Sequence, residues 1–150
     1  MSQLVEFSHL TIPAHPTKLS PLRRHLRRCL CNIPQDRRDE IVLAVSEAVT
    51  NSVTHAYEPG RHGTIEVTLW TESEALWIEV RDHGQWRVPA AEPRPTGHGL
   101  GIRLMQQLFT CVLIHHDRHG TQVLLQQPLA APVPDRSPLG RPADRPSGEL

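Results

Sequence analysis

The sequence predicts an α+β fold: a two-layer sandwich in which three helices cover one face of a mixed, mostly antiparallel sheet. Two observations lead to this fold class. Apolar residues recur with the helical period in some stretches and alternate with polar residues, as in strands, in others. These stretches follow one another as strand, helix, helix, strand, strand, loop, helix, strand, strand, an order that indicates a sheet covered by helices.

The first two elements are a strand and a helix. Residues 4–12 are expected to form the strand, with Val5, Phe7 and Ile12 as its apolar residues. Ser20 followed by Pro21 is typical of a helix start, because the hydroxyl caps free amides and proline fits the first helical position. The predicted helix runs to about Leu30. Its inward face consists of Leu22, Leu26 and Leu30.

A second, longer helix is predicted from Asp36 to about residue 56. Its inward row consists of Ile41, Val45, Ala48 and Ser52, widened by Val42 and Val49. Two alternating stretches follow, residues 63–72 and 75–82, and the polar segment 71–74 between them indicates a hairpin. The residues expected to point inward from the two strands are Ile65, Val67, Leu69, Leu76, Ile78 and Val80.

The next segment, residues 83–98, contains Gly, Pro and Arg without an apolar period, which indicates a long loop. A third helix is expected over residues 99–109. Its apolar residues are Leu100, Leu104, Met105 and Leu108. Residues 111–114 are expected to form a buried strand, and a turn at 117–120 leads into the closing strand, 121–127.

The C-terminal segment, residues 128–150, contains six of the fourteen prolines together with Arg, Asp and Ser. Such a composition buries too little apolar surface to offset the entropy of ordering, so a disordered tail is expected. Residues 1–127 are therefore expected to form one domain. A Pro-rich docking ligand is the alternative for the tail, although it has no clean PxxP motif with aromatic context.

Charge and composition exclude several classes of protein. Sixteen basic and sixteen acidic residues cancel, so nothing draws the whole chain to nucleic acid or to an anionic membrane. No apolar run approaches the roughly 18 residues that span a bilayer, and the N-terminus lacks the pattern of a secretory signal. Three cysteines cannot all pair with one another. We therefore expect a cytoplasmic protein without a transmembrane segment.

Three polar residues, Glu47, Asn51 and His55, share one row of the second predicted helix. Asparagine is unfavourable within a helix because its amide competes for backbone hydrogen bonds. A solvated helix face is the simpler explanation for any one of these residues. The pair Glu47 and Asn51 also has a chemical use, because a carboxylate can accept a proton from an attacking hydroxyl and an amide oxygen can ligate Mg²⁺.

Three short motifs contain glycine. The motif D-x-G at residues 82–84 follows a predicted strand, where a carboxylate can accept hydrogen bonds from an exocyclic amino group and glycine lets a flat ring approach. The motif G-x-G-x-G at residues 97–101 lies at a helix start, where free amides bind phosphate. The dipeptide G-T at residues 120–121 precedes the last strand. An ordinary turn or hinge explains each motif equally well when it is taken alone.

The order and spacing of these motifs resemble the GHKL, or Bergerat-type, ATPase family. The shared features are E-x₃-N on a helix, D-x-G after a hairpin strand, a loop, G-x-G-x-G at a helix start and G-T before a strand. Within the family, the chain resembles the small bacterial anti-sigma-factor serine kinases. The most specific stretch is residues 47–57, EAVTNSVTHAY. The resemblance covers residues 5–127 and leaves the tail outside.

The resemblance implies a role for each matching residue. Asn51 would hold the Mg²⁺ that bridges the ATP phosphates, and Glu47 would be the catalytic base that takes the proton from a serine hydroxyl of a partner protein. Asp82 would bind the adenine amino group, with Gly84 against the ring and Thr121 close to Asp82. Such a set suffices for phosphoryl transfer, which depends mainly on positioning and charge neutralisation.

The other residues of the implied nucleotide site surround the phosphates. Residues 85–96 would form a mobile lid, and His55 matches a position next to the nucleotide. The phosphate-wrapping segment would consist of Gly97, Gly99, Leu100 and Gly101.

The function implied is that of an anti-sigma factor that uses ATP and Mg²⁺ as a serine/threonine-protein kinase. It would bind a sigma factor and phosphorylate an anti-sigma antagonist, and relatives suggest a homodimer. The alternative is an ATP-responsive sequestering module with little or no kinase activity. Glu47 favours the kinase, since a pure binder needs no base. Trp86 favours the binder, because it replaces the second glycine of the family pattern D-x-G-x-G.

Four arginines on the first predicted helix form a basic cluster. A solvated face is the simpler explanation for it. The resemblance implies that Arg23 and Arg24 contribute to a partner-docking surface instead. Direct binding of nucleic acid is not expected, because the net charge is zero and no aromatic residues are interleaved with the arginines.

Overall fold

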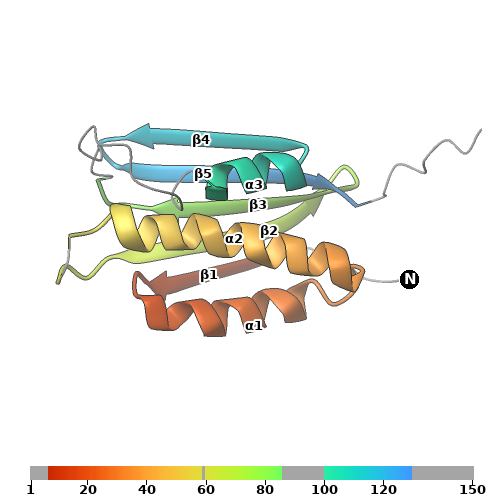
Figure 1. Cartoon of the computed structure of the whole chain (residues 1–150), viewed down its shortest axis with the longest axis horizontal. Coiled ribbons are helices and arrows are strands. Elements are labelled where there is room, and N and C mark those ends of the chain that lie inside the picture. Colours follow the sequence, from red (N-terminus) through yellow and green to blue (C-terminus); the bar gives the residue numbers. More distant parts are fainter. Residues whose placement is uncertain (1–6, 59, 86–99, 130–150) are drawn as a thin grey trace, which may run out of the picture.

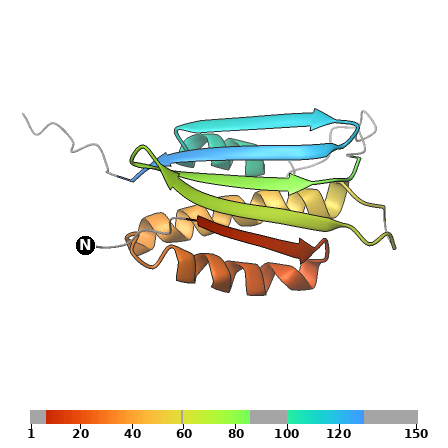
Figure 2. The ribbon, with the colours of Figure 1, turned by 180° about the vertical axis from the view of Figure 1, so that it is seen from behind.

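The computed structural model describes residues 7–58, 60–85 and 100–129, which form two packed layers (Figure 1). Five described strands form one sheet in the order β1-β2-β3-β5-β4. All four pairings between these strands are antiparallel, so the described sheet contains no parallel pair. Three α-helices lie on one face, and Figure 2 shows the opposite face without a described helix on it. The predicted α+β sandwich is confirmed.

The first helix, α1, covers Leu19–Cys29 and follows a short 3-10 turn at Pro16–Lys18. The prediction that Ser20 caps this helix is wrong, because Ser20 is already its second residue. The cause is local: the side chain of His15 accepts a hydrogen bond from the Thr17 amide, which starts the turn earlier. The inward residues Leu22, Leu26 and Leu30 are buried, as the leucine spacing predicts.

The first strand, β1, covers Phe7–Pro13 and pairs with β2 at one edge of the sheet. The predicted strand began at residue 4, and residues 1–6 lie outside the described part. Ile12 faces the core, whereas Phe7 is 68% exposed, because residues an odd number of positions apart point to opposite faces of a strand.

The longest described helix, α2, covers Gln35–His55 and crosses the sheet. Its inward row is buried as predicted, including Ser52. Gln35 follows Pro34, so the helix starts one residue before the predicted Asp36. The C-terminal turns of α2 lie over the end of the sheet where β3 finishes, and this arrangement positions the site described below.

The central hairpin consists of β2, Thr64–Glu72, and β3, Ala75–Asp82. Ser73 and Glu74 form the turn with φ of 51° and 59°, the positive values that two-residue hairpin turns require. The predicted alternation is confirmed, with residues 65, 67 and 69 and residues 76, 78 and 80 buried. On the other face, Trp70 and Trp77 stack with ring centroids 6.0 Å apart.

The last elements are α3, Leu100–Leu108, and the strands β4, Cys111–Asp117, and β5, Gly120–Pro128. The strand predicted at residues 111–114 is present, but the prediction that it is buried is wrong, since Leu113 is 57% exposed. The reason is position: β4 is an edge strand, paired only with β5 in the described sheet, and one of its faces points away from the helices. Residues 86–98 of the predicted loop and residue 99 of the predicted third helix lie outside the described part.

The folded region extends two residues into the predicted tail. Pro128 is the last residue of β5, and the Leu129 amide donates a hydrogen bond to the Glu74 carbonyl at 2.9 Å. The Leu129 side chain also packs against the core. The rest of the predicted tail, residues 130–150, lies outside the described residues.

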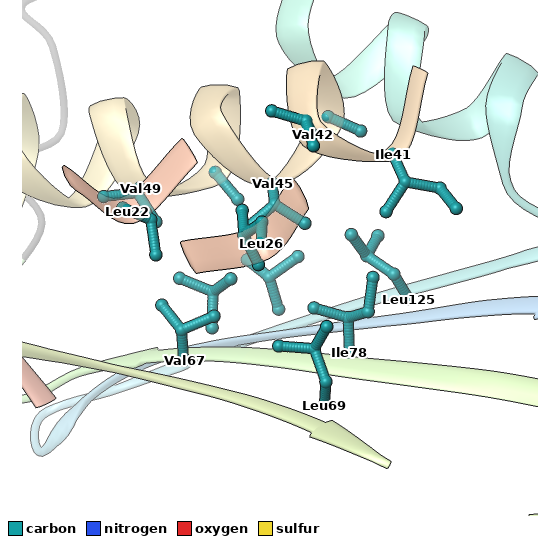
Figure 3. Close-up of a cluster of buried hydrophobic side chains, with 14 of the residues drawn as sticks. Leu22, Leu26, Ile41, Val42, Val45, Val49, Val67, Leu69, Ile78 and Leu125 are labelled. Carbon is teal, nitrogen blue, oxygen red and sulfur yellow. The ribbon is translucent and has the colours of Figure 1, made fainter. Parts of the chain in front are cut away.

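The core lies between the helical layer and the inner face of the sheet (Figure 3). Leu26 of α1 and Val45 of α2 point down onto Val67 and Ile78 of the central strands, and Leu125 of β5 extends the cluster toward α3. Burying such side chains contributes about 1.5–3 kcal/mol each and fixes how α2 sits on β3.

Within the described ranges, no helix is both long and apolar enough to cross a bilayer.

Candidate functional site

The centre of the candidate site is the carboxylate of Asp82, which is only 1% exposed at the end of β3. Its Oδ2 accepts a hydrogen bond from the Ser52 hydroxyl of α2 at 2.7 Å. Its Oδ1 accepts from the backbone amides of Gly84 and Thr121, each at 3.2 Å. A buried carboxylate requires such donors, and these three come from a helix, a turn and a neighbouring strand.

The local sequence explains why this carboxylate is buried. Alternation along β3 points Ile78, Val80 and Asp82 to the same, helix-facing side of the sheet. Asp82 is the last residue of the strand, beneath the C-terminal turns of α2, and its register partner in β5 is Thr121. The D-x-G and G-T motifs therefore meet because β3 and β5 are neighbours, which their positions in the sequence do not reveal.

Gly84 packs directly against the end of α2. A Cβ atom at this position would lie 2.0 Å from the Ala56 carbonyl oxygen, so only glycine fits without a shift of the backbone. Gly120 is similar: it has a φ of +142°, and a Cβ atom there would lie 1.9 Å from the Asp82 carbonyl oxygen. Both glycines let neighbouring backbone segments approach the turn that follows β3.

Tyr57 joins three parts of the site through its hydroxyl. The hydroxyl donates to the Thr64 carbonyl at 2.6 Å and accepts from the His83 amide at 2.9 Å. Burial raises the pKa of Tyr57 above its ordinary value, and the negative charges of Asp82 and Glu66 act in the same direction. The tyrosine therefore holds the residue between Asp82 and Gly84 against the start of β2.

Thr121 is buried and has a further partner on β4. Its hydroxyl lies 2.9 Å from Nδ1 of His116. The direction of this hydrogen bond depends on the tautomer of the imidazole. Together, the contacts described so far link α2, β3, β5 and β4 at one end of the sheet.

The row Glu47, Asn51 and His55 is half-buried on α2. Asn51 is adjacent in sequence to Ser52, which contacts Asp82, and Glu47 lies about 7.5 Å before Ser52 along the helix axis. The structure thus brings Glu47 and Asn51 to the same end of the molecule as Asp82, the carboxylate predicted to bind adenine. Their chemical roles remain predictions.

The predicted phosphate-wrapping segment is only partly described. Gly97 and Gly99 lie outside the described residues, as do residues 86–96 of the predicted lid. Leu100 and Gly101 are the first two residues of α3, and α3 packs beside α2. The helix that follows the glycine motif is therefore a neighbour of the helix that carries Asn51.

Two of the cavities at this end of the sheet border the turn after Asp82. One, of about 80 Å³, is lined by Asp82 and Thr121 together with Arg81, His115 and Gln122, which belong to the face of the sheet that points away from the helices. Gly84 lines a larger cleft of about 560 Å³, together with Ala56, Tyr57, His83 and the loop before β2. The turn after Asp82 therefore lies between two openings to solvent.

Metal ions that proteins bind without a substrate are usually held by several His, Cys, Asp or Glu side chains. In the part of the chain that the structure describes, no three His, Cys, Asp or Glu side chains gather in an arrangement suited to a metal ion. The predicted ligand, Asn51, is an amide. Magnesium commonly takes one or two protein ligands together with substrate phosphates, so Asn51 suits a metal that arrives with a nucleotide.

The predicted docking arginines differ in environment. Arg24 is exposed, whereas Arg23 is half-buried and its Nε donates to the Ser46 hydroxyl of α2 at 3.1 Å. Arg23 therefore contributes to the packing of α1 on α2, and Arg24 is accessible to a partner.

Sequence reasoning missed several contacts of the site. The sequence predicted that Ser52 faces the core, but not that it contacts Asp82. Tyr57 was noted only as part of residues 47–57, the stretch that resembles the ATPase family, and its contacts with Thr64 and His83 were not predicted. A polar residue on an otherwise apolar inward row was a usable signal for Ser52, since such a hydroxyl needs a partner. No local pattern indicates that His116 lies beside Thr121, because the two meet through strand pairing.

Known proteins are similar to this chain over most of its length. A sequence model of the family described as "Histidine kinase-like ATPase domain" matches residues 12–127. The anti-sigma F factor of Anoxybacillus flavithermus is 28% identical over 135 residues, which cover 83% of this chain and 84% of that protein. The anti-sigma F factor of Bacillus licheniformis is 26% identical over 140 residues, which cover 87% and 88%.

Two solved structures are also similar. The RsbU and RsbW domains of Rv1364c from Mycobacterium tuberculosis superpose with a TM-score of 0.67 at 25% identity, covering 84% of this chain and 33% of that one. The histidine kinase domain of the Erythrobacter litoralis EL346 blue-light activated histidine kinase superposes with a TM-score of 0.55 at 24% identity, covering 79% and 62%. The second likeness concerns the fold alone.

Proposed function

The chain belongs to the histidine kinase-like ATPase domain family, and we propose that it is an ATP-binding anti-sigma factor that phosphorylates a serine or threonine of an antagonist protein. The relatives named anti-sigma F factors support the regulatory part of this proposal. The observation that carries the nucleotide part is the hydrogen bond between Ser52 and Asp82. This hydrogen bond joins the part of α2 that carries Asn51 to the buried carboxylate of Asp82 at one end of the sheet.

The residues present fit an adenine nucleotide. A carboxylate that is 1% exposed and held by three protein donors still has free lone pairs on its oxygens, so it can accept a further hydrogen bond from an exocyclic amino group. In this proposal Asp82 binds that amino group, Gly84 lies against the ring, and Thr121 and His55 border the nucleotide. Asn51 holds the magnesium ion. The proposed phosphate contacts are Gly97, Gly99, Leu100 and Gly101.

The proposed catalytic base is Glu47. When bound, ATP supplies the phosphoryl group and Mg²⁺ neutralises charge on the phosphates. Glu47 accepts the proton of the substrate hydroxyl at its carboxylate, one helical turn from Asn51. Its half-buried position supports this role, because the side chain is held by the helix while remaining accessible to a partner.

The proposed partners are a sigma factor and an antagonist that presents the substrate hydroxyl. The exposed Arg24 of α1 is the proposed docking residue, and Arg23 supports it by fixing α1 on α2. The resemblance also supports a homodimer, which light scattering on the purified protein tests.

A sequestering module without kinase activity is the second candidate. Trp86 favours it, because this residue replaces a glycine of the family pattern next to the proposed adenine site. Such a module would bind ATP and a sigma factor but would transfer no phosphoryl group.

The test is transfer from radiolabelled ATP to a candidate antagonist in the presence of Mg²⁺. Glu47→Ala should abolish transfer and retain ATP binding, whereas Glu40→Ala, two turns earlier on the same helix face, should retain both. Sigma-factor capture without transfer to any antagonist would support the second candidate. A wild-type protein that binds no ATP would contradict both candidates.

A further inference from the structure

We propose that Ser52 is a positioning residue that sets which purine base the site accepts, by fixing the orientation of the Asp82 carboxylate. The inference rests on the proposed function, because it assumes that Asp82 contacts the base. Ser52 itself is not taken to contact the nucleotide. Ser52 instead determines the direction in which the carboxylate oxygens of Asp82 point toward the base.

The first step is that Ser52 controls the plane of the carboxylate. Oδ1 of Asp82 accepts from two backbone amides, those of Gly84 and Thr121. Hydrogen bonds to a single oxygen hold its position but leave rotation of the carboxylate plane less restricted. The Ser52 hydroxyl bonds the other oxygen, Oδ2, at 2.7 Å and restrains that rotation.

The second step is that Ser52 departs from the usual behaviour of a hydroxyl in a helix. Serine and threonine within helices commonly donate back to the carbonyl four residues earlier. Two neighbours on α2 do so: Ser46 donates to the Val42 carbonyl at 2.6 Å, and Thr50 to the Ser46 carbonyl at 2.7 Å. The Ser52 hydroxyl instead donates its hydrogen bond to the side chain of Asp82 on β3.

The third step concerns polarity. Because a carboxylate only accepts, the Ser52 hydroxyl must be the donor in this hydrogen bond. With the Ser52 proton bound to Oδ2, the carboxylate of Asp82 is held in one orientation and presents its oxygens as acceptors. A 6-amino purine offers a donor to this carboxylate, whereas a 6-oxo purine offers another acceptor and is disfavoured. Loss of the hydroxyl removes this restraint on the carboxylate plane, so discrimination between the two purines should fall.

The experiment compares Ser52→Ala with the matched control Ser46→Ala, since both serines are 2% exposed on α2. Isothermal titration calorimetry measures the Kd of ATP, of inosine triphosphate and of inorganic triphosphate, each with Mg²⁺. The wild-type chain and the Ser46→Ala variant should prefer ATP over inosine triphosphate. Ser52→Ala should lower this preference about tenfold, with inorganic triphosphate unaffected.

Two further variants keep the test informative if Ser52→Ala unfolds. Ser52→Thr retains the hydroxyl and should retain the preference for ATP, whereas Ser52→Cys retains the size with a weaker donor and should lower it. Equal loss of affinity for both nucleotides in Ser52→Cys would mean a purely structural role and would overturn the inference. A wild-type chain that binds both nucleotides equally would overturn it too, while leaving nucleotide binding intact. Failure to bind any nucleotide would overturn the proposed function and this inference together.

Discussion

The backbone amide of Thr121 lies 3.2 Å from Oδ1 of Asp82, although 39 residues separate the two in sequence. The contact exists because β3 and β5 are neighbours in the sheet and pair Asp82 with Thr121. Two short motifs that each resemble an ordinary turn thereby form one buried polar centre. The proposed adenine site depends on this centre, and its carboxylate is the most direct place to test it.

Asp82→Asn should abolish tight ATP binding while the protein stays folded. The new carbonyl oxygen can still accept from the amides of Gly84 and Thr121, and the new amino group can donate to the Ser52 oxygen. Unfolding in urea should show a loss of about 1–2 kcal/mol. The amino group would face the adenine amino group, so the Kd for ATP should rise at least about tenfold.

Glu79→Gln is the matched control for Asp82→Asn. Glu79 lies on the same strand but faces the uncovered side of the sheet, where Oε2 accepts from Gln122 at 2.6 Å. Its ATP affinity should equal that of the wild-type chain. Unchanged affinity in Asp82→Asn would remove Asp82 from the site, and an equal loss for unrelated triphosphates would argue against a contact with adenine.

Asn51→Ala should remove the part of nucleotide affinity that depends on magnesium. The amide is half-buried on α2, so its loss should change stability little, whereas the proposed metal ligand disappears. Calorimetry with Mg²⁺ and with a chelator measures the difference. In Asn51→Ala the nucleotide affinity should be the same with Mg²⁺ as with the chelator. In Thr54→Ala, a control at an exposed position on the same helix, the affinity should remain higher with Mg²⁺. An unchanged magnesium effect in Asn51→Ala would contradict the assignment.

Gly84→Ala should destabilise the protein by about 1–3 kcal/mol, because the added Cβ would meet the Ala56 carbonyl oxygen. The turn after Asp82 must then move, so ATP affinity should fall as well. Gly60→Ala is the comparison: its φ is +84°, but an added Cβ would meet nothing within 4 Å. Urea unfolding should show the larger loss for Gly84→Ala, and the reverse order would mean that the turn adapts to the side chain.

Local patterns were enough to predict most helices and strands. The inward row of α2 and the alternation of β2 and β3 are buried as the periodicity predicts, because each element packs one face on a single core. The predicted start of α1 was wrong by two residues, Pro21 instead of Leu19, because the side chain of His15 starts a 3-10 turn directly before the helix.

Contacts set by strand order could not be predicted in the same way. The exposure of Leu113 follows from the edge position of β4, and the contact between His116 and Thr121 follows from its pairing with β5. The contact of Ser52 with Asp82 needs both the register of the sheet and the position of α2 on it. The candidate site residues were named from the resemblance, but the side chains that contact them could be identified only from the fold.

Tyr57 should ionise only above its ordinary pKa of 10.0, because burial disfavours the charged form and the charges of Asp82 and Glu66 add to this effect. The folded protein therefore holds the phenolic proton more tightly than the unfolded chain. The corresponding stability is complete below pH 10 and is lost as the pH rises through the pKa of folded Tyr57. The chain has one tyrosine, so the ultraviolet absorbance of tyrosinate titrates Tyr57 alone. The midpoint should be higher in buffer than in concentrated urea, and Tyr57→Phe should remove this part of the alkaline loss of stability. A midpoint in buffer at or below that in urea would show that neither burial nor the charges of Asp82 and Glu66 disfavour the ionised form of Tyr57 in the folded protein.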